Sequence, residues 1–217
     1  MPPTVRPLTP AALAALVVAA AAERLGEARE RGVAVRVGVD GALAADTGPL
    51  ADLVADHALA TGVGALRVRA RDFLHRRSVR LEHGPADVDA AYERAVDWAA
   101  LQREVLEPLG DPARLTWLPR LRDPDTDRAA REPVRTAGPG ALLVVDGPYL
   151  LRWELTGDLD VVVHLQTSDA ALRRRVPDGD PAPGAWARYV GETAPAERAD
   201  LVVRAEHPDR PALVTPG

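Results

Sequence analysis

The 217-residue sequence contains no cysteine, lysine, isoleucine or asparagine, and only 4% of its residues are aromatic. The absence of cysteine excludes disulfides, thiol nucleophiles and zinc ribbons. The absence of lysine excludes any chemistry that needs a lysine amine, because all 27 Lys and Arg residues are arginine. Such a bias is typical of codon usage in a GC-rich genome, so most of these absences carry no information about function.

Charge and hydropathy exclude two further classes. The net charge of −5 argues against a nucleic-acid-binding surface spread over the chain. No segment reaches the roughly 18 apolar residues of a membrane span. Arg6 followed by the alanine-rich run from Ala11 to Ala22 loosely resembles a signal peptide, but Thr9 and Pro10 are typical of a helix start. We therefore expect a helix over Thr9–Arg31, ended by Gly32, and a cytoplasmic protein.

Short apolar runs alternate with helical segments along the rest of the chain, which predicts a single domain over 1–217: a helix over 9–31, a core over 33–206 and a tail over 207–217. Strands that are apolar on both faces predict a parallel sheet covered by helices on both sides. The strands are expected at Val33–Val39, Ala65–Val68, Ala141–Val145, Val161–Leu165 and Leu201–Val203. Helices are expected at Pro49–Ala60, Ala86–Leu109, Ser168–Arg175 and Trp186–Tyr189. Ligands of such folds bind at the carboxyl ends of the strands, where the Pro-rich segment Asp111–Pro139 is expected to form a long loop.

The loop after the first strand has the place of a phosphate-binding GxxxxGK[ST] loop. Gly41 matches the first glycine, but Asp46 replaces the second glycine, Thr47 replaces the lysine and Gly48 replaces the Ser or Thr. These changes remove the cation that faces the outer phosphates and the hydroxyl that ligates magnesium. Asp46 also adds a negative charge where phosphates would lie.

Several segments resemble the uridine kinase-like branch of P-loop proteins, especially actinobacterial members, from about Val33 to Glu206. The matching segments are 37–41, 70–74, 96–101, 104–110, 144–151 and 198–203. The resemblance implies an α/β, three-layer P-loop NTPase-like fold with a five-stranded parallel sheet in the order 2-3-1-4-5. It also implies ATP-dependent phosphorylation of a nucleoside 5′-hydroxyl with Mg²⁺.

The resemblance implies roles for individual residues. The family's catalytic Asp falls on Arg71, so Asp72 is the nearest candidate base, although neighbouring side chains of an extended segment point to opposite faces. The substrate-binding candidates are Asp97 (on ribose), Arg71 and His75. Asp146 is the metal candidate, and an Asp that only accepts backbone N–H groups is an equally good interpretation. The cofactor-binding candidates are Gly41, Ala44, Ala45, Asp46, Thr47, Gly48 and the lid arginines Arg174 and Arg175. Those arginines could equally form a solvated helix face.

Three functions follow from these residues. A pseudokinase that binds a nucleotide or nucleoside is favoured, because the phosphate loop, the metal ligand and the base are all altered. An active kinase of a nucleoside or other small hydroxyl substrate, with an atypical ATP site, is the first alternative. A non-enzymatic interaction module, or another activity that uses Asp40, Asp46, Asp72 and Asp146 as acids or metal ligands, is the second. Neither nucleic acid nor membrane is an expected partner, while a homodimer or a protein partner stays open.

Overall fold

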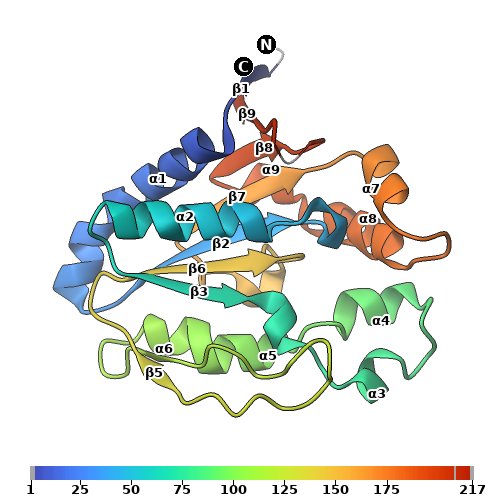
Figure 1. The fold of residues 1–217 in the computed structure, drawn as a ribbon, viewed down its shortest axis with the longest axis horizontal. Helices are drawn as coiled ribbons and strands as arrows, with labels where there is room; N and C mark the ends of the chain where they lie inside the picture. Colours follow the sequence, from blue (N-terminus) through green and yellow to red (C-terminus); the bar gives the residue numbers. More distant parts are fainter. Residues whose placement is uncertain (1–2, 208, 216–217) are drawn as a thin grey trace.

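The computed structural model describes residues 3–207 and 209–215, which form a central sheet between two layers of helices (Figure 1). The sheet consists of β1 (Thr4–Pro7), β2 (Val35–Gly41), β3 (Ala65–Arg69), β6 (Leu142–Gly147), β7 (Val161–Gln166), β8 (Leu201–Arg204) and β9 (Ala212–Thr215). A separate pair is formed by β4 (Thr116–Trp117) and β5 (Arg135–Thr136).

The sheet has seven strands in the order β1-β9-β8-β7-β2-β6-β3. The predicted five-stranded sheet is therefore wrong in strand number and in the order of the whole sheet. The five neighbouring strands β3, β6, β2, β7 and β8 are parallel. Numbered among themselves along the chain, these five lie in the predicted order 2-3-1-4-5, which therefore holds within this part of the sheet only. β9 and β1 extend the β8 edge in antiparallel pairing. Part of the segment expected to be a tail thus forms a strand, while residues 208 and 216–217 of that tail lie outside the described residues.

The helices of the two outer layers are short except for α1. They are α1 (Pro10–Arg31), α2 (Gly48–Ala60), α3 (Arg77–Arg80), α4 (Val88–Glu93), α5 (Trp98–Leu101), α6 (Glu107–Leu109), α7 (Asp169–Arg175), α8 (Ala182–Thr193) and α9 (Pro195–Arg198). Single turns form η1 (Leu43–Ala45), η2 (Ala70–Phe73), η3 (Gln102–Leu106) and η4 (Trp153–Leu155). Both predicted ends of α1 are confirmed, because the Thr9 hydroxyl accepts the Ala12 N–H and Gly32 ends the helix with φ 71°. No helix of the described ranges is long and apolar enough to cross a bilayer.

The long helix predicted over Ala86–Leu109 is wrong. Asp87 and Asp97 each accept a backbone N–H three residues ahead, so each begins a new short helix, α4 and α5. Between them Val96 leaves the helical path and pairs with Leu74 in an isolated antiparallel bridge. Side-chain capping within the segment therefore prevails over its helical periodicity.

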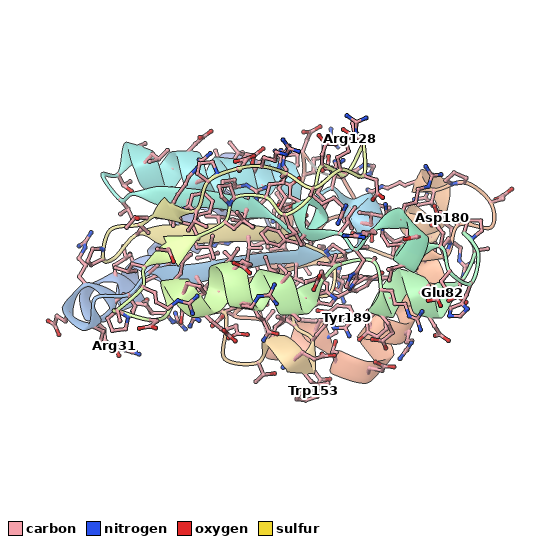
Figure 2. The ribbon with its side chains drawn as sticks, turned by 90° about the horizontal axis from the view of Figure 1, so that it is seen from below. Arg31, Glu82, Arg128, Trp153, Asp180 and Tyr189 are labelled. Carbon is pink, nitrogen blue, oxygen red and sulfur yellow. The ribbon has the colours of Figure 1, made fainter. Side chains whose placement is uncertain are left out.

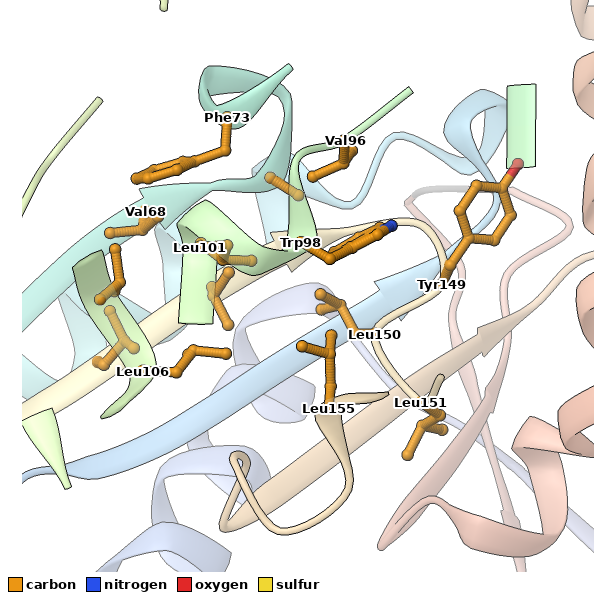
Figure 3. Packing of buried hydrophobic residues seen from close by; sticks show 14 of the residues in the cluster. Val68, Phe73, Val96, Trp98, Leu101, Leu106, Tyr149, Leu150, Leu151 and Leu155 are labelled. Carbon is orange, nitrogen blue, oxygen red and sulfur yellow. The ribbon is translucent and has the colours of Figure 1, made fainter. Parts of the chain in front are cut away.

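The two faces of the sheet are buried by different layers. α1 and α2 cover one face with aliphatic side chains, which include the fully buried Val37 of β2 and Val144 of β6. The other face packs against α5, η3, α6 and α8 in a cluster that contains the sequence's only Phe, Phe73, and most of its aromatic rings; Figure 3 shows Phe73, Trp98 and Tyr149 in this cluster. Because side chains alternate along a strand, consecutive residues at the strand ends belong to opposite faces. The carboxylates that end the strands are divided in the same way.

Candidate functional site

The candidate site lies at the carboxyl ends of β2, β3 and β6, where residues 41–48 connect β2 to α2. The loop forms the single turn η1 and then passes through Asp46, whose φ of 52° lies in the left-handed region. Thr47 precedes α2, whose first residues are Gly48 and Pro49. The predicted strand, loop and helix are therefore present at this position.

Thr47 fills the inside of this loop. Its side chain is buried, and its hydroxyl donates a hydrogen bond to Asp146 Oδ2 at 2.6 Å. Its methyl group faces Gly41, since a Cβ placed on Gly41 would lie 2.9 Å from Thr47 Cγ2. The side chain at position 47, where the GxxxxGK[ST] pattern has lysine, thus points into the loop.

Asp146 is held on its other side by an arginine from a neighbouring strand. Arg67 Nη2 of β3 lies 2.7 Å from Asp146 Oδ1, in an ion pair whose angle departs from that of a hydrogen bond. The same guanidinium contacts Asp52 of α2 through Nε at 2.8 Å. One Asp146 oxygen therefore meets a hydroxyl and the other a cation, and a metal ion would have to displace the guanidinium.

Asp46 and Gly48 change the charge at the start of α2. The Asp46 side chain is exposed, and its Oδ1 lies 3.5 Å from the position that a Cβ on Gly48 would take. A helix N-terminus attracts anions because its N–H groups carry partial positive charge. The Asp46 carboxylate brings its own negative charge to this end, where it competes with any phosphate.

Asp72 lies within the same group of side chains. It belongs to the turn η2 rather than to an extended segment, so strict alternation does not apply, and its side chain is buried next to Arg120 (Nε to Oδ1, 3.4 Å). Burial raises the pKa of Asp72, the arginines Arg120, Arg69 and Arg71 oppose this, and the charge of Asp146 adds to it. The negative charge of Asp146 therefore contributes to the raised pKa of Asp72.

Replacing Asp72 by Asn tests this burial. A carboxyl group whose pKa is higher in the folded state than the ordinary value of about 3.9 destabilises the fold as pH rises between the two values. Asp72→Asn should therefore raise the melting temperature at pH 7 relative to the native chain, and the gain should vanish below the unfolded-state pKa. Thermal unfolding of both proteins from pH 3 to pH 8 measures this difference. A variant that is equally destabilised at every pH would contradict it.

Asp97 and His75, two predicted substrate residues, lie together. His75 Nδ1 is 3.6 Å from Asp97 Oδ2, while Asp97 Oδ1 accepts the Ala100 N–H at the start of α5. Arg71, the third, is exposed and lies 3.5 Å from Asp125. Arg71 also lines a cavity of about 210 Å³ between the loop and α4, which Tyr149 borders as well. Of the three predicted residues, only Arg71 borders this cavity.

The two lid arginines of the prediction lie at the end of α7. Arg175 Nη1 donates to the Ala44 carbonyl in the loop at 3.1 Å, and its Nη2 donates to the Glu206 carbonyl. Arg174 is exposed on the same helix. α7 therefore contacts the loop through Arg175, which binds the loop's backbone.

Three arrangements were not foreseen from the sequence. Arg67 beside Asp146 and Arg120 beside Asp72 come from segments without a recognisable motif; the alternation of Arg67, Val68 and Arg69 along β3 could have suggested a charged face. The third is a fully buried network around Asp40 on the opposite face of the sheet from Asp146. Because of that separation, Asp40 and Asp146 cannot form the joint acidic or metal site that one alternative required.

No family model and no curated protein matches the chain. Among solved structures, a candidate uridine kinase from Bacillus stearothermophilus superposes with a TM-score of 0.66 at 19% identity, covering 83% of this chain and 97% of that one. A candidate fructose transport system kinase from Silicibacter sp. TM1040 superposes with a TM-score of 0.61 at 24% identity, covering 88% and 93%. The chain has the fold of the P-loop kinases. At these identities the likeness establishes the kinase-like fold, and the roles of individual residues rest on their own geometry.

Proposed function

We propose that the chain is a catalytically impaired relative of the P-loop kinases that binds a nucleotide or nucleoside. The observation that carries this proposal is the closure of Asp146 by the Thr47 hydroxyl and the Arg67 guanidinium. In a working phosphoryl-transfer site, these positions face the phosphates and the metal.

The residues present do not fit a magnesium ion. Gly48 has no hydroxyl to offer, and Arg67 neutralises the Asp146 carboxylate that would hold the ion. Within residues 3–207 and 209–215, no group of three His, Asp or Glu side chains could hold a metal. Phosphoryl transfer depends on charge neutralisation by metal and cation, so we expect turnover far below that of a kinase.

A nucleoside or nucleotide could still bind although catalysis is lost, because cavities lie on both sides of the loop. The cavity of about 210 Å³ contains Arg71 and Tyr149 and offers a site for a nucleoside. A second cavity of about 160 Å³ is lined by Asp46, Pro49 and Leu50 on one side and by the β8–β9 segment on the other.

Calorimetry and a coupled kinase assay test the proposal. We expect uridine or cytidine to bind without ATP and Mg²⁺, and Arg71→Gln to weaken that binding by about tenfold, the loss of one hydrogen bond to a charged group. Arg173→Gln, on the exposed end of α7, is the matched control and should bind normally. Turnover with uridine, cytidine or small alcohols in the usual kinase range of about 1–100 s⁻¹ would refute the impairment. Absence of binding by every nucleoside and nucleotide would refute the binding function.

Two observations favour an active kinase as the second candidate. Arg67 brings a cation to the site by another route, and arginine binds phosphate well. Burial keeps the pKa of Asp72 raised, as a general base requires. If this candidate is right, the native chain shows a measurable turnover and Arg67→Gln abolishes it. If the chain is catalytically impaired, the native chain itself shows no turnover in the kinase range.

A further inference from the structure

A further cavity lies away from the loop. It has a volume of about 670 Å³, within the range of about 300–1,000 Å³ typical of small-molecule sites. β7 and β8 form its floor at their carboxyl ends, and α8 and α9 form its walls. None of the loop residues 41–48 lines it, so its ligand can differ from that of the candidate site.

A buried histidine provides one wall of this cavity. His164 is 2% exposed, and its Nδ1 lies 2.7 Å from Asp40 Oδ2. Asp40 also accepts the Leu150 N–H at 2.9 Å and the Tyr189 hydroxyl at 3.1 Å; burial and the Asp40 charge raise the pKa of Tyr189, which keeps that proton in place. Figure 2 shows Tyr189 inside the molecule, whereas Trp153 projects from its edge.

The orientation of His164 follows from these contacts. Because a carboxylate can only accept, the proton of the neutral imidazole belongs on Nδ1, and Nε2 becomes an acceptor. No residue among 3–207 and 209–215 forms a hydrogen bond with Nε2, and His164 lines the cavity. A nearly buried polar atom thus faces the cavity without a partner from the described chain.

Charged side chains of both signs line the same cavity. Gln166 follows His164 on the same face of β7, and Arg204 of β8 is in register with Gln166. Arg204 has no ion-pair partner in the described part of the chain, and the same holds for the lining carboxylates Asp169 and Glu197. The third lining carboxylate, Glu206, already accepts the Ser168 N–H and hydroxyl at 2.9 Å each.

The remaining wall is apolar. The Trp186 ring stacks on the His164 imidazole with centroids 5.8 Å apart and planes 7° from parallel. Val190 on the next turn of α8 is 43% exposed although it is apolar, and Pro195 continues the wall from α9. A ligand with an apolar body would cover this surface.

We propose that this cavity binds a small apolar zwitterion, specifically an α-amino acid with an apolar side chain. The ligand carboxylate would pair with Arg204, whose planar guanidinium suits bidentate recognition. The ammonium group would donate to His164 Nε2 and lie near Asp169 and Glu197, and the side chain would pack on Trp186 and Val190. This arrangement gives each unpartnered group of the cavity a partner of matching chemistry.

Calorimetry of the full chain with L-phenylalanine and L-leucine tests the proposal. Phenethylamine lacks the carboxylate and 3-phenylpropionate lacks the ammonium, so each should bind at least tenfold more weakly than L-phenylalanine. Arg204→Gln should weaken the amino acid at least tenfold and leave phenethylamine unchanged. The double variant Asp169→Asn with Glu197→Gln should weaken the amino acid and leave 3-phenylpropionate no weaker.

All three changed residues are exposed, so the variants should keep the native melting temperature. Arg173→Gln is the matched control, because this arginine lies on α7 but does not line the cavity. Failure of both amino acids to bind, or equal affinity for phenylalanine and either analogue, would overturn the proposal. The outcome is independent of the nucleotide assays, because the proposal does not rest on the function assigned to the loop.

Discussion

Asp40→Ala should lower the free energy of unfolding by at least about 3 kcal/mol, because it removes one acceptor that three buried donors share. Asp40 is fully buried and accepts three hydrogen bonds, from the Leu150 N–H, His164 Nδ1 and the Tyr189 hydroxyl. The substitution leaves three buried donors without an acceptor, and each such group costs about 1–3 kcal/mol. Urea unfolding followed by circular dichroism measures the loss.

Two further variants provide a comparison for the loss of stability expected in Asp40→Ala. Tyr189→Phe removes one of the three donors together with the acceptor of the Leu151 N–H, so its cost should be smaller, about 1–3 kcal/mol. Asp52→Ala removes a half-exposed carboxylate that contacts Arg67 and Arg69, and exposed pairs contribute at most about 1 kcal/mol. If Asp40→Ala costs no more than Asp52→Ala, the network does not contribute as described.

Restoring the phosphate loop should raise ATP affinity about 100-fold. The change combines Asp46→Gly, Thr47→Lys and Gly48→Ser with Arg67→Gln, so that an anion is removed, a cation is added and Asp146 is released. Asp46→Gly and Thr47→Lys each favour ATP by a few kcal/mol at short range, whereas the loss of the Arg67 cation and the screening by solvent reduce this gain. About 3 kcal/mol remains, which corresponds to about two powers of ten in Kd. Calorimetry with ATP and Mg²⁺ measures the gain.

The backbone accommodates these changes. Glycine adopts the φ of 52° at Asp46 more easily than aspartate does, and a Cβ on Gly48 meets only ordinary contacts at 3.5 and 3.9 Å. The triple variant without Arg67→Gln separates the two effects, since Arg67 should then still compete for Asp146. An unchanged Kd in a folded quadruple variant would mean that the loop is not what limits ATP binding. Adding Arg71→Asp, at the family's base position, then tests whether turnover appears.

Local signals determined most of what could be predicted of the fold. The ends of α1 follow from Thr9, Pro10 and Gly32, and the parallel strands follow from short apolar runs. The helix over Ala86–Leu109 failed because Asp97 was interpreted through a family motif, although an Asp ahead of a helical run is also a helix start. β1 was missed because its only pairing, with β9, joins positions at opposite ends of the sequence. β9 was missed because the region after Glu206 was interpreted as a tail.

The site was predictable in position but not in its contacts. Asp72, Asp146 and the loop do gather at the carboxyl ends of the strands, as parallel topology requires. From the sequence, no cation takes the place of the lysine that Thr47 replaces. In the structure, however, Arg67 of β3 contacts Asp146. This contact joins residues on two different strands, and nothing near Thr47 in the sequence indicates it. The Asp40 network likewise depends on β2, β7 and α8 meeting in space.

The antiparallel pair of β1 and β9 also constrains how the molecule is made. Thr4 pairs with Thr215 and Pro7 with Ala212, so β1 acquires its partner only after residues 212–215 have been synthesised. Until then β1 has no partner strand, and the nascent chain exposes an unpaired strand edge. The paired strands of the parallel part lie closer to one another in sequence than β1 and β9 do, so they can pair earlier. The antiparallel edge of β1 and β9 should therefore be completed after the parallel part of the sheet has formed.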